Sequence, residues 1–140
     1  MGRSYWFECS RCGYRATVSG CGDRGLDFFV QTVVCCDCKQ LYDAVTRLRI
    51  ADDSRFGLPK AGALRPKLIN PFRRLKTPPT FQSALNRLPH LGVRCFKWLL
   101  FKPQCPISAL HRAQPWNHPG KCPRCGLHLE KSALPYRIWD

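Results

Sequence analysis

The chain has 140 residues, ten cysteines and a formal net charge of +14. Twelve prolines and ten glycines in so short a chain argue against one regular core and favour two very small modules. The first residues lack a secretory signal and no apolar run approaches the roughly 20 residues that cross a bilayer, which predicts a cytoplasmic protein whose cysteines bind metal rather than form disulfides.

Residues 1–50 are predicted to form an N-terminal metal-binding module built from strands. The aromatic run 5–7 favours a strand, and a sharp turn at the first cysteine pair lets 15–18 return as a second strand. Residues 26–34 are a long strand candidate, and the partial alternation of 41–50 indicates a further strand. The glycines of 19–25 indicate a loop. Cysteines follow the first and third of these strands, so two hairpins with cysteines at their tips are expected.

Residues 51–79 are predicted to be a basic, proline-rich arm, because their prolines recur too closely for a helix or a sheet. Residues 80–140 then form a C-terminal zinc-knuckle module. The expected fold is small, metal-stabilised and β-rich, with two zinc-ribbon-like modules joined by the arm and one short helix.

Within the C-terminal module, a short helix is expected over 80–88, with Thr80 as its N-cap. Residues 93–101 form a buried strand or a short helix, which periodicity does not distinguish. The segments 127–130 and 135–139 are expected to make a closing hairpin. Three aromatic side chains are expected in the core of this module: Phe96, Trp98 and Phe101.

Two Cys-x2-Cys pairs, Cys9 with Cys12 and Cys35 with Cys38, predict the first metal site. Such a pair places two sulfurs along one edge of a zinc tetrahedron. The 22 residues between the pairs, 13–34, are close to the spacing of four-cysteine ribbons. We therefore predict one Zn²⁺ held by all four. Cys36 is an alternative to Cys35 but would give a poorer turn.

The knuckle at Cys122 and Cys125 predicts a second Zn²⁺ and needs two further ligands. Cys105 and His111 complete a site of three cysteines and one histidine, which satisfies the closed four-ligand rule. Two alternatives for the fourth ligand stay open: His118 and Cys95.

The knuckles resemble those of zinc ribbons, over about residues 5–50 and 105–140. The first knuckle, in which glycine and tyrosine follow Cys12, is also similar to the first knuckle of rubredoxins, and the one at Cys122 and Cys125 is similar to their second. The zinc-ribbon resemblance implies nucleic-acid or protein partners, and the rubredoxin one implies iron in the same sulfur tetrahedron. Because many unrelated proteins share the motif, it implies a fold and a metal but not a function.

All of the net charge lies in one stretch, since residues 54–129 hold fourteen lysines and arginines and no carboxylate. A surface selected for solubility alone mixes both signs, so the stretch predicts a polyanionic partner, most commonly nucleic acid. We expect phosphate contacts by five residues of the arm: Arg65, Lys67, Arg73, Arg74 and Lys76.

The sequence thus predicts a non-enzymatic zinc protein that binds nucleic acid, with RNA or a ribonucleoprotein favoured. An enzyme is not expected, because carboxylates are few and no nucleophile motif is present. The alternative is a zinc-ribbon docking subunit of a larger assembly, whose arm binds an acidic protein surface. A rubredoxin-like iron electron carrier is a third reading.

Overall fold

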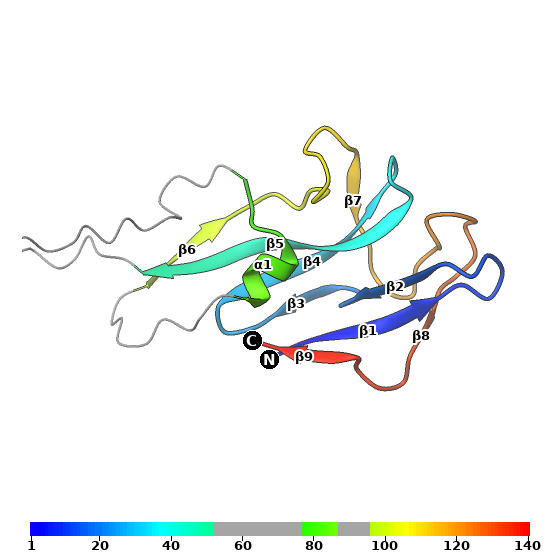
Figure 1. The fold of residues 1–140 in the computed structure, drawn as a ribbon, viewed down its shortest axis with the longest axis horizontal. Coiled ribbons are helices and arrows are strands. Elements are labelled where there is room, and N and C mark those ends of the chain that lie inside the picture. Colours follow the sequence, from blue (N-terminus) through cyan, green and yellow to red (C-terminus); the bar gives the residue numbers. More distant parts are fainter. Residues whose placement is uncertain (52–76, 87–95) are drawn as a thin grey trace, which may run out of the picture.

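The computed structural model describes residues 1–51, 77–86 and 96–140 of the chain (Figure 1). These ranges form two antiparallel sheets and one short helix, which confirms a small β-rich fold with little helix. No helix among them has the length and apolar character needed to cross a membrane.

The first sheet is centred on β1, which pairs with three other strands. Its members are β1 (Gly2–Glu8), β2 (Arg15–Val18), β8 (Glu130–Lys131) and β9 (Arg137–Trp139). The predicted strand at 15–18 and its hairpin with β1 are confirmed. The predicted closing hairpin is wrong, because β8 and β9 both run antiparallel to β1, with Lys131 opposite Phe7 and Trp139 opposite Gly2.

The second sheet has the order β3-β4-β5-β6, and β7 also pairs with β4. Its strands are β3 (Gly22–Arg24), β4 (Phe28–Cys35), β5 (Gln40–Ala51), β6 (Phe96–Leu100) and β7 (Ala113–Pro115). The predicted β4–β5 hairpin is confirmed, and the apolar segment near 93–101 contains a strand. β3 lies inside a predicted loop, where the edge of β4 gives it a pairing partner that local sequence does not reveal.

Helix α1 (Phe81–Leu85) begins where the sequence predicts. Thr80 caps it, because the Thr80 hydroxyl accepts the amide of Ser83 at 3.2 Å. Ala84 is buried, and the helix ends at Asn86. The rest of the predicted range, 87–88, lies outside the described residues.

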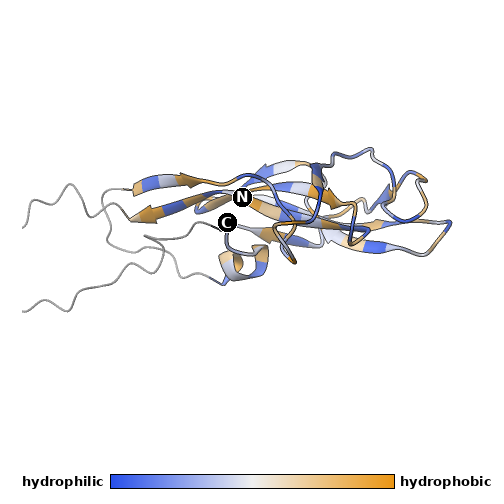
Figure 2. Cartoon of the chain, turned by 90° about the horizontal axis from the view of Figure 1, so that it is seen from above, coloured by the Kyte–Doolittle hydropathy of each residue, from blue (hydrophilic) through white to orange (hydrophobic). Residues whose placement is uncertain are grey.

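Within the described ranges, buried apolar side chains form two clusters. One contains Phe7, Trp116 and the cysteines of the turns, and the other packs Phe28 and its strand neighbours against α1 and Trp139. The rings of Phe28 and Trp139 stack with centroids 4.6 Å apart. Hydrophobic and hydrophilic residues alternate along much of the strands, with α1 lying on one side of them (Figure 2).

The predicted modules 1–50 and 80–140 do not coincide with the two sheets, since each sheet takes strands from both ranges. Ala51 pairs with Phe96, so residues 52–95 connect two neighbouring strands of one sheet. The ends of the chain also meet, with the Met1 amino group 3.3 Å from the Asp140 carboxylate (Figure 1).

Candidate metal centres

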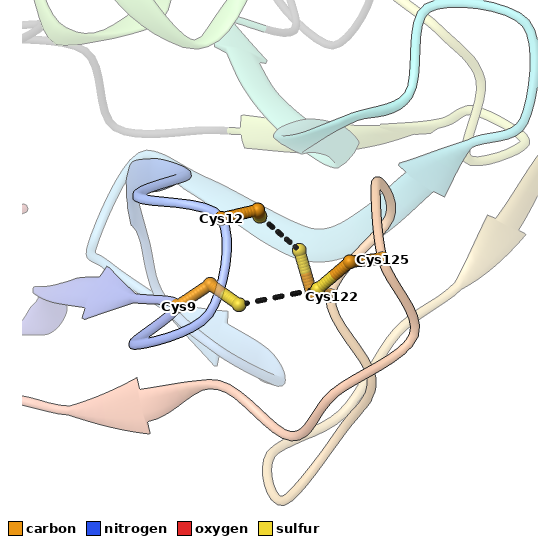
Figure 3. A group of neighbouring side chains, drawn as sticks. All are labelled: Cys9, Cys12, Cys122 and Cys125. Carbon is orange, nitrogen blue, oxygen red and sulfur yellow. Dashed lines mark hydrogen bonds between the residues drawn. The ribbon is translucent and has the colours of Figure 1, made fainter.

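The first metal group consists of Cys9, Cys12, Cys122 and Cys125, whose sulfurs all lie within 4.8 Å of one another (Figure 3). The sulfurs of Cys9 and Cys125 are 3.3 Å apart, and those of Cys12 and Cys122 are 3.7 Å apart. A disulfide needs about 2.05 Å, whereas the edge of a zinc–sulfur tetrahedron is about 3.8 Å for bonds of 2.3 Å. The four thiols are free and fit one metal ion.

The two knuckles of this group have the same backbone geometry. In each, the amide of the first cysteine donates to the carbonyl five residues later, at 2.9 Å for Cys9 and 2.6 Å for Cys122. The glycine after the second cysteine is left-handed, with φ of +66° at Gly13 and +78° at Gly126. Side chains disfavour that conformation, so glycine stabilises the turn that places both sulfurs on one side.

Two neighbouring thiols of the first metal group have pKa values shifted in opposite directions. The Cys12 amide stabilises the neighbouring thiolate and lowers the pKa of Cys9 to about 7. The Tyr14 amide acts in the same direction on Cys12, but desolvation and hydrogen bonds with the other three thiols outweigh it and raise the pKa of Cys12 to about 12. A divalent cation would favour all four thiolates, so metal binding must release protons.

The second metal group consists of Cys35, Cys38, Cys105 and His111, again with donor atoms within 4.8 Å of one another. The Cys38 sulfur lies 3.2 Å from His111 Nδ1 and 3.8 Å from the Cys105 sulfur. Its knuckle resembles the other two, but Lys39 occupies the left-handed position, with φ of +52°.

Backbone hydrogen bonds hold the loop that carries Cys105 and His111 against the β4–β5 turn. The Cys36 amide donates to the Arg112 carbonyl at 2.9 Å, and the Arg112 amide donates to the Asp37 carboxylate at 2.7 Å. β7 follows directly and pairs with the end of β4. The loop is therefore positioned by contacts independent of a metal.

Electrostatics also distinguish the two cysteines of this turn. Desolvation opposes ionisation of Cys35, yet hydrogen bonds from the Cys38 amide and from neighbouring thiols lower its pKa. Desolvation and the hydrogen bond with Cys35 raise the pKa of Cys38 to about 11. Desolvation, followed by the contact with Cys38, raises the pKa of nearby Tyr42 to about 12.

Seven cysteines and His111, the eight ligands expected from the sequence, are all brought together, but their partition differs from the prediction. The pair of Cys9 and Cys12 shares a group with the C-terminal knuckle and not with Cys35 and Cys38. The reason is that the two hairpin tips belong to different sheets, and the segment 105–125 supplies the missing half of each group. One signal was present: only the knuckles that share the first group are followed by glycine.

No family model, curated protein or solved structure matches this chain. The description of both groups as zinc-ribbon-like knuckles therefore rests on their spacing and geometry. Each group could hold one metal ion, and the chemistry of seven thiols and one imidazole fits zinc or iron.

The remaining candidates lie elsewhere. His118 belongs to neither group: its amide donates to the Gly20 carbonyl at 2.7 Å, its ring lies 5.5 Å from that of Phe7, and desolvation lowers its pKa. Cys36 is exposed and outside both groups, which supports Cys35 as the ligand. Cys95 and the five basic residues predicted on the arm lie outside the described residues.

Proposed function

We propose that the chain is a non-enzymatic zinc protein that binds nucleic acid, RNA above all, mainly through phosphate contacts. The observation that carries this proposal is the absence of any carboxylate in residues 54–129, which hold fourteen basic residues. A structural role for the metals is supported by the ligand count, because four protein ligands leave no open position for catalysis.

The position of the basic stretch in the fold supports phosphate binding. The segment 52–95, which holds nine of the fourteen basic residues, begins and ends next to paired residues, since Ala51 and Phe96 are partners in the β5–β6 ladder. A polyanion held by the stretch would therefore lie next to the metal-stabilised sheet. Phosphate contacts of this kind fix position without reading base sequence.

Zinc content tests the first part of the proposal. The purified chain should carry two zinc ions and lose its fold when a chelator removes them. Protein expressed in zinc-supplemented medium must be compared with iron-supplemented protein, because such sites accept either metal. Red protein that retains iron under both conditions would favour the rubredoxin-like reading.

A salt titration tests the second part. If the arm neutralises about five phosphates, log affinity should fall against log salt with a slope of roughly −3.5 for single strands and −4.5 for duplexes. The variant R73A/R74A/K76A should flatten the slope by about two to three units. The charge-matched control R3A/R11A/R137A alters exposed arginines outside the basic stretch and should leave the slope nearly unchanged.

Two results would contradict nucleic-acid binding: an affinity that does not depend on salt, or no affinity for any nucleic acid at low salt. Retention of both metals by each variant shows that the comparison concerns charge and not folding. Loss of binding together with metal would require the variants to be replaced by single substitutions.

A further inference from the structure

The two faces of the β4–β5–β6 region differ in what covers them. Phe28, Leu48 and Leu99 face the cluster that contains α1 and Trp139. Successive side chains of a strand point to opposite faces, so the residues between them face away from this core. That opposite face carries no helix in the described ranges.

Aromatic and arginine side chains alternate on this opposite face. We call it the aromatic–arginine face and define it by six residues: Phe29, Arg47, Arg49, Phe96, Trp98 and Leu100. Arg47 lies opposite Phe29 on one side and Leu100 on the other, and Arg49 lies opposite Trp98. The strand register, and not sequence proximity, therefore creates the face.

The rings and guanidinium groups of the face contact one another directly. The Arg47 guanidinium lies 5.2 Å from the ring centroid of Phe29, and that of Arg49 lies 4.4 Å from the ring of Phe96. The rings of Phe29 and Trp98 meet edge to face, with centroids 5.2 Å apart. These contacts order the side chains before any ligand arrives, which reduces the entropy cost of binding.

Three members of the face remain open to solvent: Arg47, Trp98 and Leu100. Trp98 is 42% exposed and Leu100 is 71% exposed, which corrects the prediction that Trp98 belongs to the core. Burial of the Trp98 indole in the core would be favourable. Its exposure beside arginines therefore indicates a surface that can bind a planar, negatively charged ligand.

A groove of about 480 Å³ continues the face toward β3. Arg24, Phe29 and Arg47 line it, with Pro103 forming part of its wall. Neither Arg24 nor Arg47 forms an ion pair with a carboxylate of the described residues. The carboxylate that lines the groove, Asp23, already accepts the amides of Arg3 and Arg24, each at 2.7 Å.

We propose that the aromatic–arginine face stacks the bases of a single-stranded nucleic acid, and this inference rests on the proposed function above. An exposed indole on a sheet face suits unpaired bases, whose faces are accessible, whereas the bases of a duplex are already stacked. Arg24 and Arg47 supply positive charge for phosphates at the groove. The arm begins at Ala51, the partner of Phe96 in the β5–β6 ladder, so one strand of nucleic acid can contact both the arm and the face.

The test compares Trp98→Ala with Trp6→Ala in the full chain. Trp6 is a matched control because it is 43% exposed, lies on the other sheet and also makes one edge-to-face ring contact, with Tyr136. The probes are a fluorescein-labelled 12-nucleotide oligouridylate and a 12-base-pair duplex of mixed sequence, titrated at several salt concentrations.

We expect W98A to weaken binding of the oligouridylate by about 5- to 150-fold, the range for loss of one stacked base, with partial rescue by W98F. The slope of log affinity against log salt and the affinity for the duplex should each stay within about twofold of the values for the unmodified chain, because Trp98 carries no charge. W6A should bind both probes like the unmodified chain. Ultraviolet cross-linking of 4-thiouridine RNA should label the peptide that contains Trp98.

Other outcomes overturn the inference. Equal oligouridylate binding by W98A and the unmodified chain would remove the stacking face but leave phosphate binding by the arm intact. An equal loss for W98A and W6A, or an equal loss for both probes, would show a general effect of the substitutions. No binding of either probe by the unmodified chain would remove the proposed function as well.

Discussion

The partition of the eight ligands can be tested by counting metals in combined variants. Replacing both cysteines of one knuckle with serine should remove one metal ion and leave the other, because each group has four ligands and shares none with the other group. A variant in which serine replaces the cysteines of both the β1–β2 turn and the C-terminal knuckle should still bind one metal ion, since these four cysteines belong to one group. Serine at the β1–β2 turn together with the β4–β5 turn should leave none.

The structure also sets the energetic cost of each loss. The first group links Cys12 to Cys122, 110 residues apart, and the second links Cys38 to Cys105, 67 residues apart. If each metal acts as a cross-link on the unfolded chain, closure of these loops contributes about 4.8 and about 4.4 kcal/mol. Either loss is therefore comparable to the whole stability of a small domain, which is about 5–15 kcal/mol.

Native mass spectrometry at low temperature provides the metal count, and X-ray absorption provides the ligands. Zinc in the unmodified chain should average 3.5 sulfur and 0.5 nitrogen neighbours, from seven cysteines and one histidine over two ions. The variant that combines the β1–β2 turn with the C-terminal knuckle should show three sulfurs and one nitrogen. The partition would be refuted if the variant that combines the β1–β2 and β4–β5 turns retained one metal ion, or if neither combined variant retained one.

Five further substitutions at four positions test the turns, the packing and a buried carboxylate. Lys39→Gly should stabilise the chain by up to about 1 kcal/mol in urea unfolding, whereas Gly13→Ala should cost about 1–2 kcal/mol, because both positions are left-handed. Trp139→Ala should cost about 3–5 kcal/mol through loss of the stack on Phe28, whereas Trp139→Phe should cost less than about 1.5 kcal/mol, since the indole N–H has no acceptor among the described residues. Burial raises the pKa of Asp43 to about 6, so its neutral form stabilises the fold at low pH and this stabilisation is lost as the pH rises through 6. Relative to Asp43→Asn, the unmodified chain should gain about 2 kcal/mol between pH 7 and pH 4, and a difference that does not change with pH would contradict the shift.

Local sequence signals predicted the elements that depend on local contacts. The strand at 15–18 follows from the sharp turn at the first cysteine pair, and the start of α1 follows from Thr80. All eight ligands followed from cysteine spacing and the chemistry of zinc. These features need no knowledge of what lies across the fold.

The features that the sequence did not predict depend on distant segments. The path of segment 105–125 past the two hairpin tips decides which knuckles share a metal. Cysteine spacing does not distinguish the tips, because each offers two cysteine sulfurs at the same spacing. The exposure of Trp98 depends on which face of β6 is covered, and strand periodicity gives the alternation of faces without saying what covers either. Nucleic-acid binding stays a prediction until it is measured.

Completion of both metal groups by residues 105–125 has a consequence for synthesis of the chain. Each N-terminal hairpin leaves the ribosome with only two sulfur ligands and waits for partners that lie 67 to 110 residues later. At about 5–20 residues per second, that wait lasts roughly 3–20 s. During this interval the paired thiols can be oxidised and can bind metal ions only weakly. The metal is therefore selected only when the C-terminal segment supplies the remaining ligands.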